Sequence, residues 1–157
     1  MSDFSVYKSL EASRVGASSE IANGAAPVAQ SHTHEDRWRV ANLSANLAED
    51  AVGTSKYRAV VQSASIVPSK AAVANTTDYG VVTLSKRTGN GAAVTVGTAN
   101  LANVALVAFV PAALTLVSNI ANTTLAAGDV LTLTTVNTGN GVANNPACSF
   151  VFVLEDT

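Results

Sequence analysis

The stretch Leu125-Ala-Ala-Gly-Asp-Val-Leu-Thr-Leu-Thr-Thr-Val136 contains the clearest structural signal in the sequence. Gly128 and Asp129 indicate a tight turn, because glycine tolerates positive φ and an aspartate side chain bonds nearby backbone. The residues after the turn alternate, with Leu131 and Leu133 on one face and threonines on the other, which is typical of a strand in a sheet. The sequence therefore predicts a turn followed by a half-buried β-strand.

Further strand-like runs lie on both sides of this stretch, at roughly ten-residue spacing. They cover residues 57–67, 79–87, 92–98, 104–110, 114–118 and 149–154. Such a series predicts an all-β fold: an antiparallel β-sandwich, jelly-roll-like, with seven or eight strands. The order of the strands within the sheets does not follow from the sequence.

Two loops share the sequence Thr-Gly-Asn-Gly, at 88–91 and 138–141. Asn-Gly between strands is a strong hairpin signal, because both residue types tolerate positive φ. We interpret the repeat as two hairpin turns with the same backbone requirement, with internal duplication as the alternative. Neither loop is followed by Lys-Ser/Thr or by a helix start, so neither is a phosphate-binding loop. The predicted structural turn residues are Gly89, Asn90, Gly91, Gly128, Asp129, Gly139, Asn140 and Gly141.

The composition indicates which kinds of partner the protein has. Apolar residues make up 48% of the chain and charged residues only 13%, which is low for a lone soluble protein. A net charge of −2 gives no basis for nucleic-acid binding. The longest apolar run, 104–117, is broken by Pro111 and is too short to span a membrane. The strand at 150–154 is apolar on both faces, and such surplus apolar surface indicates a subunit interface in a homo-oligomer.

Residues 1–52 differ from residues 53–157. They hold seven acidic and four basic residues, both histidines and the only tryptophan, and residues 15–30 are mostly small. Large apolar side chains, which offset the entropy cost of ordering a chain, are scarce there. We therefore expect an extended N-terminal arm at 1–52 and a β-sandwich domain at 53–157.

Catalytic and metal-binding groups are scarce. The expected sandwich contains no histidine, and its acids Asp78 and Asp129 lie in separate predicted turns, so nothing indicates a carboxylate pair. His32-Thr-His34-Glu-Asp36 offers two histidines, whereas a zinc site uses three or four protein ligands. We expect no enzyme activity, no catalytic residue, no metal and no cofactor.

The arm carries the strongest contact signal. Trp and Arg are enriched at interface hot spots, and they alternate in Arg37-Trp38-Arg39. The acidic residues just before this run cancel its charge, which favours a protein contact over stacking on a base. We expect contacts with a partner protein or a sister subunit from His32, His34, Arg37, Trp38 and Arg39.

Four segments carry a resemblance to a known family: Ile66-Val-Pro68, Asn75-Thr-Thr-Asp-Tyr79, Val81-Val-Thr-Leu-Ser-Lys-Arg87 and Leu125-Ala-Ala-Gly-Asp-Val-Leu-Thr-Leu133. Residues 55–157 resemble β-sandwich structural proteins of tailed bacteriophages, in particular the small capsid decoration (cement) proteins. The resemblance implies a virion protein on the capsid exterior, a homo-oligomer with a trimer favoured. Such a protein binds the major capsid protein and stabilises the head by bridging neighbouring subunits. No functional residue carries over.

Other functions share the predicted fold. A host-surface or carbohydrate-binding module of a virion fibre or tail would show exposed aromatic residues in loops, and only Tyr79 is a candidate. A hydrolase would need a catalytic group inside the sandwich. A shell-forming coat protein is a further alternative, although the chain is short for a DNA-filled capsid.

Overall fold

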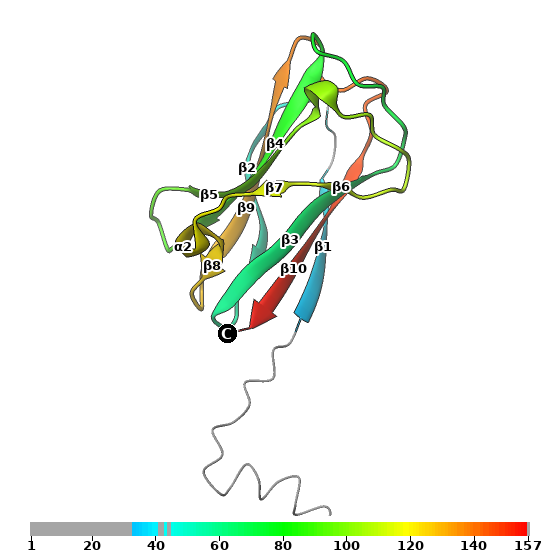
Figure 1. Ribbon diagram of the computed structural model, residues 1–157. Helices are drawn as coiled ribbons and strands as arrows, with labels where there is room; N and C mark the ends of the chain where they lie inside the picture. The colour runs from blue at the N-terminus through cyan, green and yellow to red at the C-terminus, as the bar shows by residue number, and fades with distance from the viewer. Residues whose placement is uncertain (1–32, 41–42, 44, 157) are drawn as a thin grey trace, which may run out of the picture. The chain divides into compact units, whose positions relative to one another are not determined.

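The computed structural model describes residues 33–40, 43 and 45–156, with the backbone alone described for 33–40 and 156. Nearly all of the secondary structure is β-strand (Figure 1). The short helices η1 (Leu101–Asn103) and α2 (Ile120–Thr123) follow β5 and β7, and no helix in these ranges is long and apolar enough to cross a membrane. The strands are β1 (Thr33–Val40), β2 (Leu47–Thr54), β3 (Ala59–Pro68), β4 (Tyr79–Arg87), β5 (Val94–Asn100), β6 (Ala112–Ala113), β7 (Thr115–Leu116), β8 (Thr124–Leu125), β9 (Val130–Thr138) and β10 (Cys148–Asp156).

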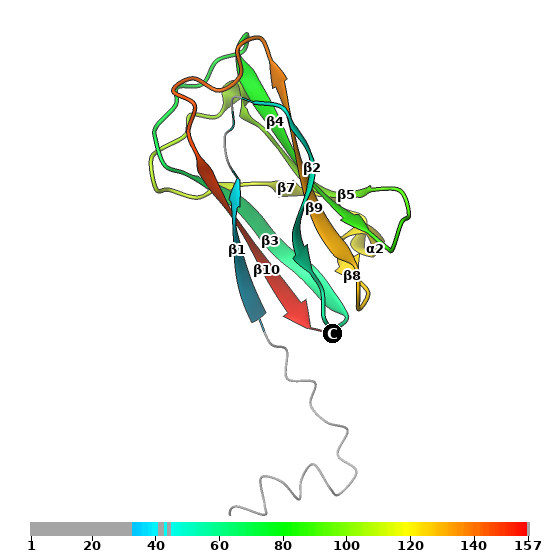
Figure 2. The same cartoon turned by 180° about the vertical axis from the view of Figure 1, so that it is seen from behind.

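The strands form two antiparallel sheets that face each other (Figures 1 and 2). One sheet has the order β1-β10-β3-β6, with β8 beside β3, and the other has the order β2-β9-β4-β5-β7. The strands β6, β7 and β8 are each two residues long. When β6 is counted and β7 and β8 are not, the orders become first-eighth-third-sixth and second-seventh-fourth-fifth, which is the strand order of a jelly roll. The predicted all-β jelly-roll sandwich is confirmed.

Residues 33–54 belong to the sandwich. β1 pairs with β10 along its whole length, starting with Thr33 opposite Glu155, and β2 pairs with β9. The predicted boundary at residue 52 is therefore wrong, because it falls inside β2. Backbone pairing with β9 and β10 attaches the segment to the sandwich, and Leu43 and Val52 are buried in its core. Residues 1–32 lie outside the described residues, so an arm there stays a prediction.

The core between the sheets is filled by alternate residues of the long strands. On β9, Leu131 and Leu133 are buried, as the alternation predicted. Gly53 of β2 faces the ring of Phe152, which a Cβ at this position would approach to 2.8 Å. The buried residues of β10 are Cys148, Phe150, Phe152 and Leu154.

The turn before β9 has the predicted conformation. Gly128 has a φ of 88°, and the Oδ2 atom of the buried Asp129 accepts a hydrogen bond from the Ala126 N–H at 2.8 Å. Asp129 Oδ1 accepts a second bond from the Thr88 hydroxyl at 2.7 Å. The Ser55 N–H donates to the Asp129 carbonyl at 2.9 Å, so this turn also holds the connection between β2 and β3.

Both Thr-Gly-Asn-Gly loops form the same four-residue turn. In each, the last glycine N–H donates to the threonine carbonyl, at 3.0 Å in 88–91 and 3.1 Å in 138–141. Positive φ falls on the first glycine of each turn, at 55° for Gly89 and 60° for Gly139, and in the second turn also on Gly141 at 74°. Neither asparagine has positive φ, contrary to expectation. The turn at 88–91 joins β4 to β5 in the predicted hairpin. The turn at 138–141 leads from β9 to β10 in the other sheet, so the second hairpin interpretation is wrong.

Candidate interaction surface

Two loops on one side of the sandwich are joined through their backbones. They are the β3–β4 loop at 69–78 and the segment 104–111 that follows η1, both on the right in Figure 1. Ala72 and Leu106 exchange two backbone hydrogen bonds, at 3.0 and 2.8 Å. The strand expected from the apolar pattern of this second segment is therefore absent, and one isolated bridge takes its place.

A tight turn closes the second loop. The Val110 N–H donates to the Val107 carbonyl at 3.1 Å, and the Phe109 N–H donates to the Pro68 carbonyl at 2.8 Å. Phe109 has a φ of 61°, in the left-handed region, which is a genuine outlier for a bulky residue. Turns with this geometry normally carry glycine or asparagine at that position. The fold therefore holds an aromatic side chain where the backbone favours glycine.

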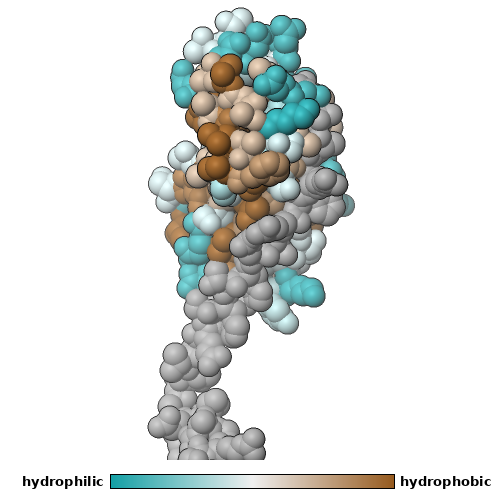
Figure 3. Space-filling model, turned by 90° about the vertical axis from the view of Figure 1, so that its right-hand side faces the viewer, coloured by the Kyte–Doolittle hydropathy of each residue, from teal (hydrophilic) through white to brown (hydrophobic). Residues whose placement is uncertain are grey.

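Apart from the buried Leu106, the large apolar side chains of the two loops are exposed. Ala72 and Leu106 are buried, and their sequence neighbours are exposed, as expected for alternation along an extended segment. The space-filling view of this side shows hydrophobic residues gathered over its upper part (Figure 3). We call five residues the apolar loop surface: Val73 (75% exposed), Val104 (41%), Val107 (56%), Phe109 (76%) and Val110 (50%).

Charge is nearly absent around this surface. Residues 88–128 contain no Asp, Glu, Lys or Arg, and the β3–β4 loop adds only Lys70 and Asp78. An exposed apolar patch of this kind marks an interaction site in a soluble protein. Sequence reasoning missed it, because an apolar run is normally interpreted as buried. The available signal was a lone aromatic among alanines and valines, two residues before Pro111.

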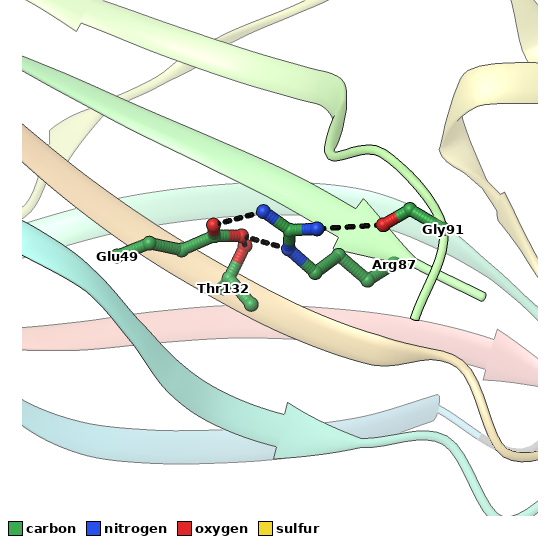
Figure 4. Close-up of polar contacts among 4 residues, drawn as sticks. All are labelled: Glu49, Arg87, Gly91 and Thr132. Carbon is green, nitrogen blue, oxygen red and sulfur yellow. Dashed lines mark hydrogen bonds and ion pairs between the residues drawn. The ribbon is translucent and has the colours of Figure 1, made fainter. Parts of the chain in front are cut away.

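A charged cluster fastens the edge strand β2 to its sheet (Figure 4). The Arg87 guanidinium on β4 binds both carboxylate oxygens of Glu49 on β2, with Nε at 2.6 Å from Oε1. The Thr132 hydroxyl on β9 donates to the same carboxylate at 2.7 Å, and Arg87 Nη1 donates to the Gly91 carbonyl at 2.6 Å. The bonds from Arg87 and then Thr132 lower the pKa of Glu49 to about 2. A carboxylate with this pKa stays charged at neutral pH, so we assign it a structural role.

The two turn carboxylates lie far apart. Asp78 precedes β4 and Asp129 precedes β9, and these strands pair antiparallel over nine residues. Asp129 lies level with residue 88, ten residues along from Asp78, so at about 3.4 Å per residue the two acids stand roughly 34 Å apart. Asp78 Oδ1 accepts a hydrogen bond from the Asn140 N–H at 2.7 Å, so this acid holds the turn at 138–141. The two acids do not form a carboxylate pair.

Cys148 is enclosed by the core. Burial raises the pKa of its thiol to about 12, so the nucleophilic thiolate is scarce at neutral pH. Within residues 33–40, 43 and 45–156, no three His, Cys, Asp or Glu residues gather as metal ligands.

The predicted contact residues of the arm fall at the edge of the described chain. His32 lies outside it, and the side chains of β1 also lie outside it. The backbone of β1 places its four predicted contact residues opposite residues 149–154 of β10. The contacts of all five therefore remain predictions. The four on β1 are His34, Arg37, Trp38 and Arg39.

Comparisons with known proteins give few matches. No protein-family model matches this sequence, and no curated protein matches it. A solved structure of infectious bursal disease virus, Gx strain, is similar with a TM-score of 0.36 and 11% identity, over 81% of this chain and 32% of the viral chain. The Gt strain structure gives a TM-score of 0.31 and 12% identity, over 82% and 31%. This chain thus spans about a third of each viral chain.

Proposed function

We propose that this protein is a capsid decoration (cement) protein, a structural virion component that binds the outer capsid surface and bridges neighbouring major capsid subunits. The observation that carries the proposal is a jelly roll with little charge that keeps large apolar side chains exposed, which favours assembly with other protein subunits. The fold alone does not specify this role, because capsid proteins, lectins and cupins all use jelly rolls.

The described surface favours assembly over ligand binding. Small-molecule sites combine a concave apolar wall with a few convergent polar groups. Phe109 instead projects among valines and alanines. Tyr57 is exposed between Lys56 and Arg58, away from other exposed aromatic residues of the described chain. Tyr79, the residue predicted for a carbohydrate-binding module, is only partly exposed. The proposed role includes no catalysis, cofactor, nucleic acid or membrane.

The sequence resemblance of residues 55–157 to phage decoration proteins supports a decoration role in particular, within the general class of structural virion proteins. The capsid contact is proposed to come from the N-terminal segment and β1, with Trp38 as the central residue, because Trp and Arg contribute most strongly to interfaces. Many copies on a symmetric shell add avidity, so a modest contact per copy is sufficient for stable decoration.

The test uses capsids assembled without this protein. We expect the full chain to bind them to saturation in pelleting and electron-microscopy assays, and to raise the temperature at which they rupture. Trp38→Ala should lower occupancy at a fixed concentration by tenfold or more, whereas Tyr57→Ala, an exposed aromatic at a different site, should not.

Failure of the full chain to bind capsids would disprove the decoration role. A further form lacking residues 1–30 keeps every described strand, so it isolates the contribution of the N-terminal segment. Unchanged binding by both this form and Trp38→Ala would move the capsid contact to the sandwich loops.

A further inference from the structure

We propose that the apolar loop surface is the site where a second copy of this chain docks, giving a two-fold pair in which the same surface meets itself. The inference concerns the protein in solution and does not depend on the virion role. Its central residue is Phe109, which is the most exposed large apolar side chain of the described residues.

The surface is held in place before any partner arrives. The bridge between Ala72 and Leu106 fixes the two loops to each other, and both residues are buried in the core. Backbone bonds from Phe109 to Pro68 and from Val110 to Val107 fix the closing turn. A surface held by such bonds loses little conformational freedom on docking, which favours association.

The backbone of Phe109 points to a function for its side chain. Left-handed φ is costly for a bulky residue and persists where the surrounding structure enforces it, commonly at functional sites. Glycine would relieve this cost without losing a buried contact, because the ring is 76% exposed. A solvent-exposed ring adds nothing to the fold that offsets the cost, whereas a ring inserted into a partner does.

Area and charge favour a second copy as the occupant. At their exposed fractions, the four valines and Phe109 present roughly 500 Å² of surface. Two such surfaces bury at most about 1,000 Å² when each is fully covered, which reaches the lower limit for a specific protein interface. The surface has no charged member, so pairing it with itself causes no like-charge repulsion.

A two-fold pair fits this surface better than a ring. A ring needs two different complementary surfaces on each subunit, whereas a two-fold pair needs one self-complementary surface. The other large apolar side chains exposed among the described residues are scattered on separate elements. Tyr57 is in the β2–β3 turn, Val94 on β5, Ile120 on α2 and Val136 on β9. The trimer implied by the family resemblance would therefore lack a second apolar surface in this part of the chain.

The experiment is analytical ultracentrifugation of the full chain over a concentration series, with two variants. Phe109→Gly removes the ring and suits the left-handed backbone, and Tyr57→Gly removes a comparably exposed aromatic outside the surface. We expect a dimer for the unaltered chain and for Tyr57→Gly. Phe109→Gly should raise the dimer dissociation constant by about 30-fold or more. Its monomer should have an equal or higher Tm, which separates loss of pairing from loss of folding.

Three outcomes would overturn the proposal. The first is an unaltered chain that stays monomeric at about 100 μM. The second is an unaltered chain that forms a trimer. The third is a dimer whose dissociation constant is unchanged by Phe109→Gly. If a monomeric chain binds capsids and Phe109→Gly weakens that binding, the surface faces the shell. If Phe109→Gly lowers the Tm of a monomeric chain, the chain itself covers the surface. The capsid assay is separate, so either proposal can fail while the other stands.

Discussion

The two Thr-Gly-Asn-Gly turns have the same sequence and the same internal hydrogen bond, yet they stand in different surroundings. At 88–91 the turn closes a hairpin, and a Cβ on Gly89 would meet nothing within 4 Å. At 138–141 the turn leads from one sheet to the other, and a Cβ on Gly139 would lie 2.2 Å from Asp78 Oδ1. The four residues therefore determine the backbone conformation of the turn. Residues distant in sequence determine how much stability is lost when a turn residue is substituted.

The groups that support the two turns also differ. The first is held by Arg87, which donates to the Gly91 carbonyl, and by the bond from Thr88 to Asp129. The second is held by Asp78, whose carboxylate accepts bonds from the Asn140 backbone and side chain at 2.7 and 3.2 Å. Substitutions at equivalent positions should therefore have unequal effects.

The largest expected difference is between the two first glycines. Gly139→Ala should destabilise the fold by about 3 kcal/mol, because positive φ adds to a clash with Asp78 and with the Thr77 carbonyl at 2.7 Å. Gly89→Ala meets only the backbone cost, about 1 kcal/mol. Denaturant unfolding measures both values. Equal midpoints would show that Asp78 moves aside and that the two turns are equivalent.

The threonines should differ by less. Thr88→Val removes the donor to the buried Asp129 carboxylate and should cost about 1–2 kcal/mol. Thr138→Val alters an exposed side chain and should stay within about 0.5 kcal/mol. Thermal unfolding of the two variants provides the comparison, and a Thr138→Val cost as large as that of Thr88→Val would contradict it.

The smallest expected effect is the pH dependence at the first turn. Glu49 has its pKa lowered from an ordinary 4.5 to about 2, so its ion pair with Arg87 stabilises the fold above pH 4.5. This contribution is lost as the pH falls from about 4.5 towards 2. The unfolding free energies of the unaltered protein and Glu49→Gln should therefore differ at pH 7 and converge near pH 2. Both groups are partly solvated, so the difference is small, and a gap independent of pH would refute this origin.

The sequence predicted the strands whose side chains alternate between buried and exposed, together with two of the turns. β4 was predicted to the residue, and the hairpin to β5 and the turn at Gly128 were also predicted. β2 was missed because it is an edge strand: only Val52 is fully buried, and Glu49 and Asp50 look like an unstructured polar segment. Edge strands gain their stability from backbone pairing with a distant partner, which local periodicity does not record.

The apolar loop surface was missed for the opposite reason. The rules that relate sequence to structure interpret a valine-rich run as buried and expect glycine where φ is positive. Phe109 violates both expectations, being exposed and left-handed. Natural sequences break local rules mainly at functional or strained positions, so the failure at Phe109 is informative.

The pairing of β1 with β10 also has a consequence for how the chain is made. Thr33 pairs with Glu155, so β1 can form its hydrogen bonds only after β10 has left the ribosome. In the same way, β2 can pair only after β9 has been synthesised. Contacts between residues this distant in sequence close late and slowly, and until then the sheet edges stay open to other chains. The jelly roll should therefore complete its folding only after β10 has been synthesised, and production of many copies at high concentration would favour aggregation unless folding is assisted.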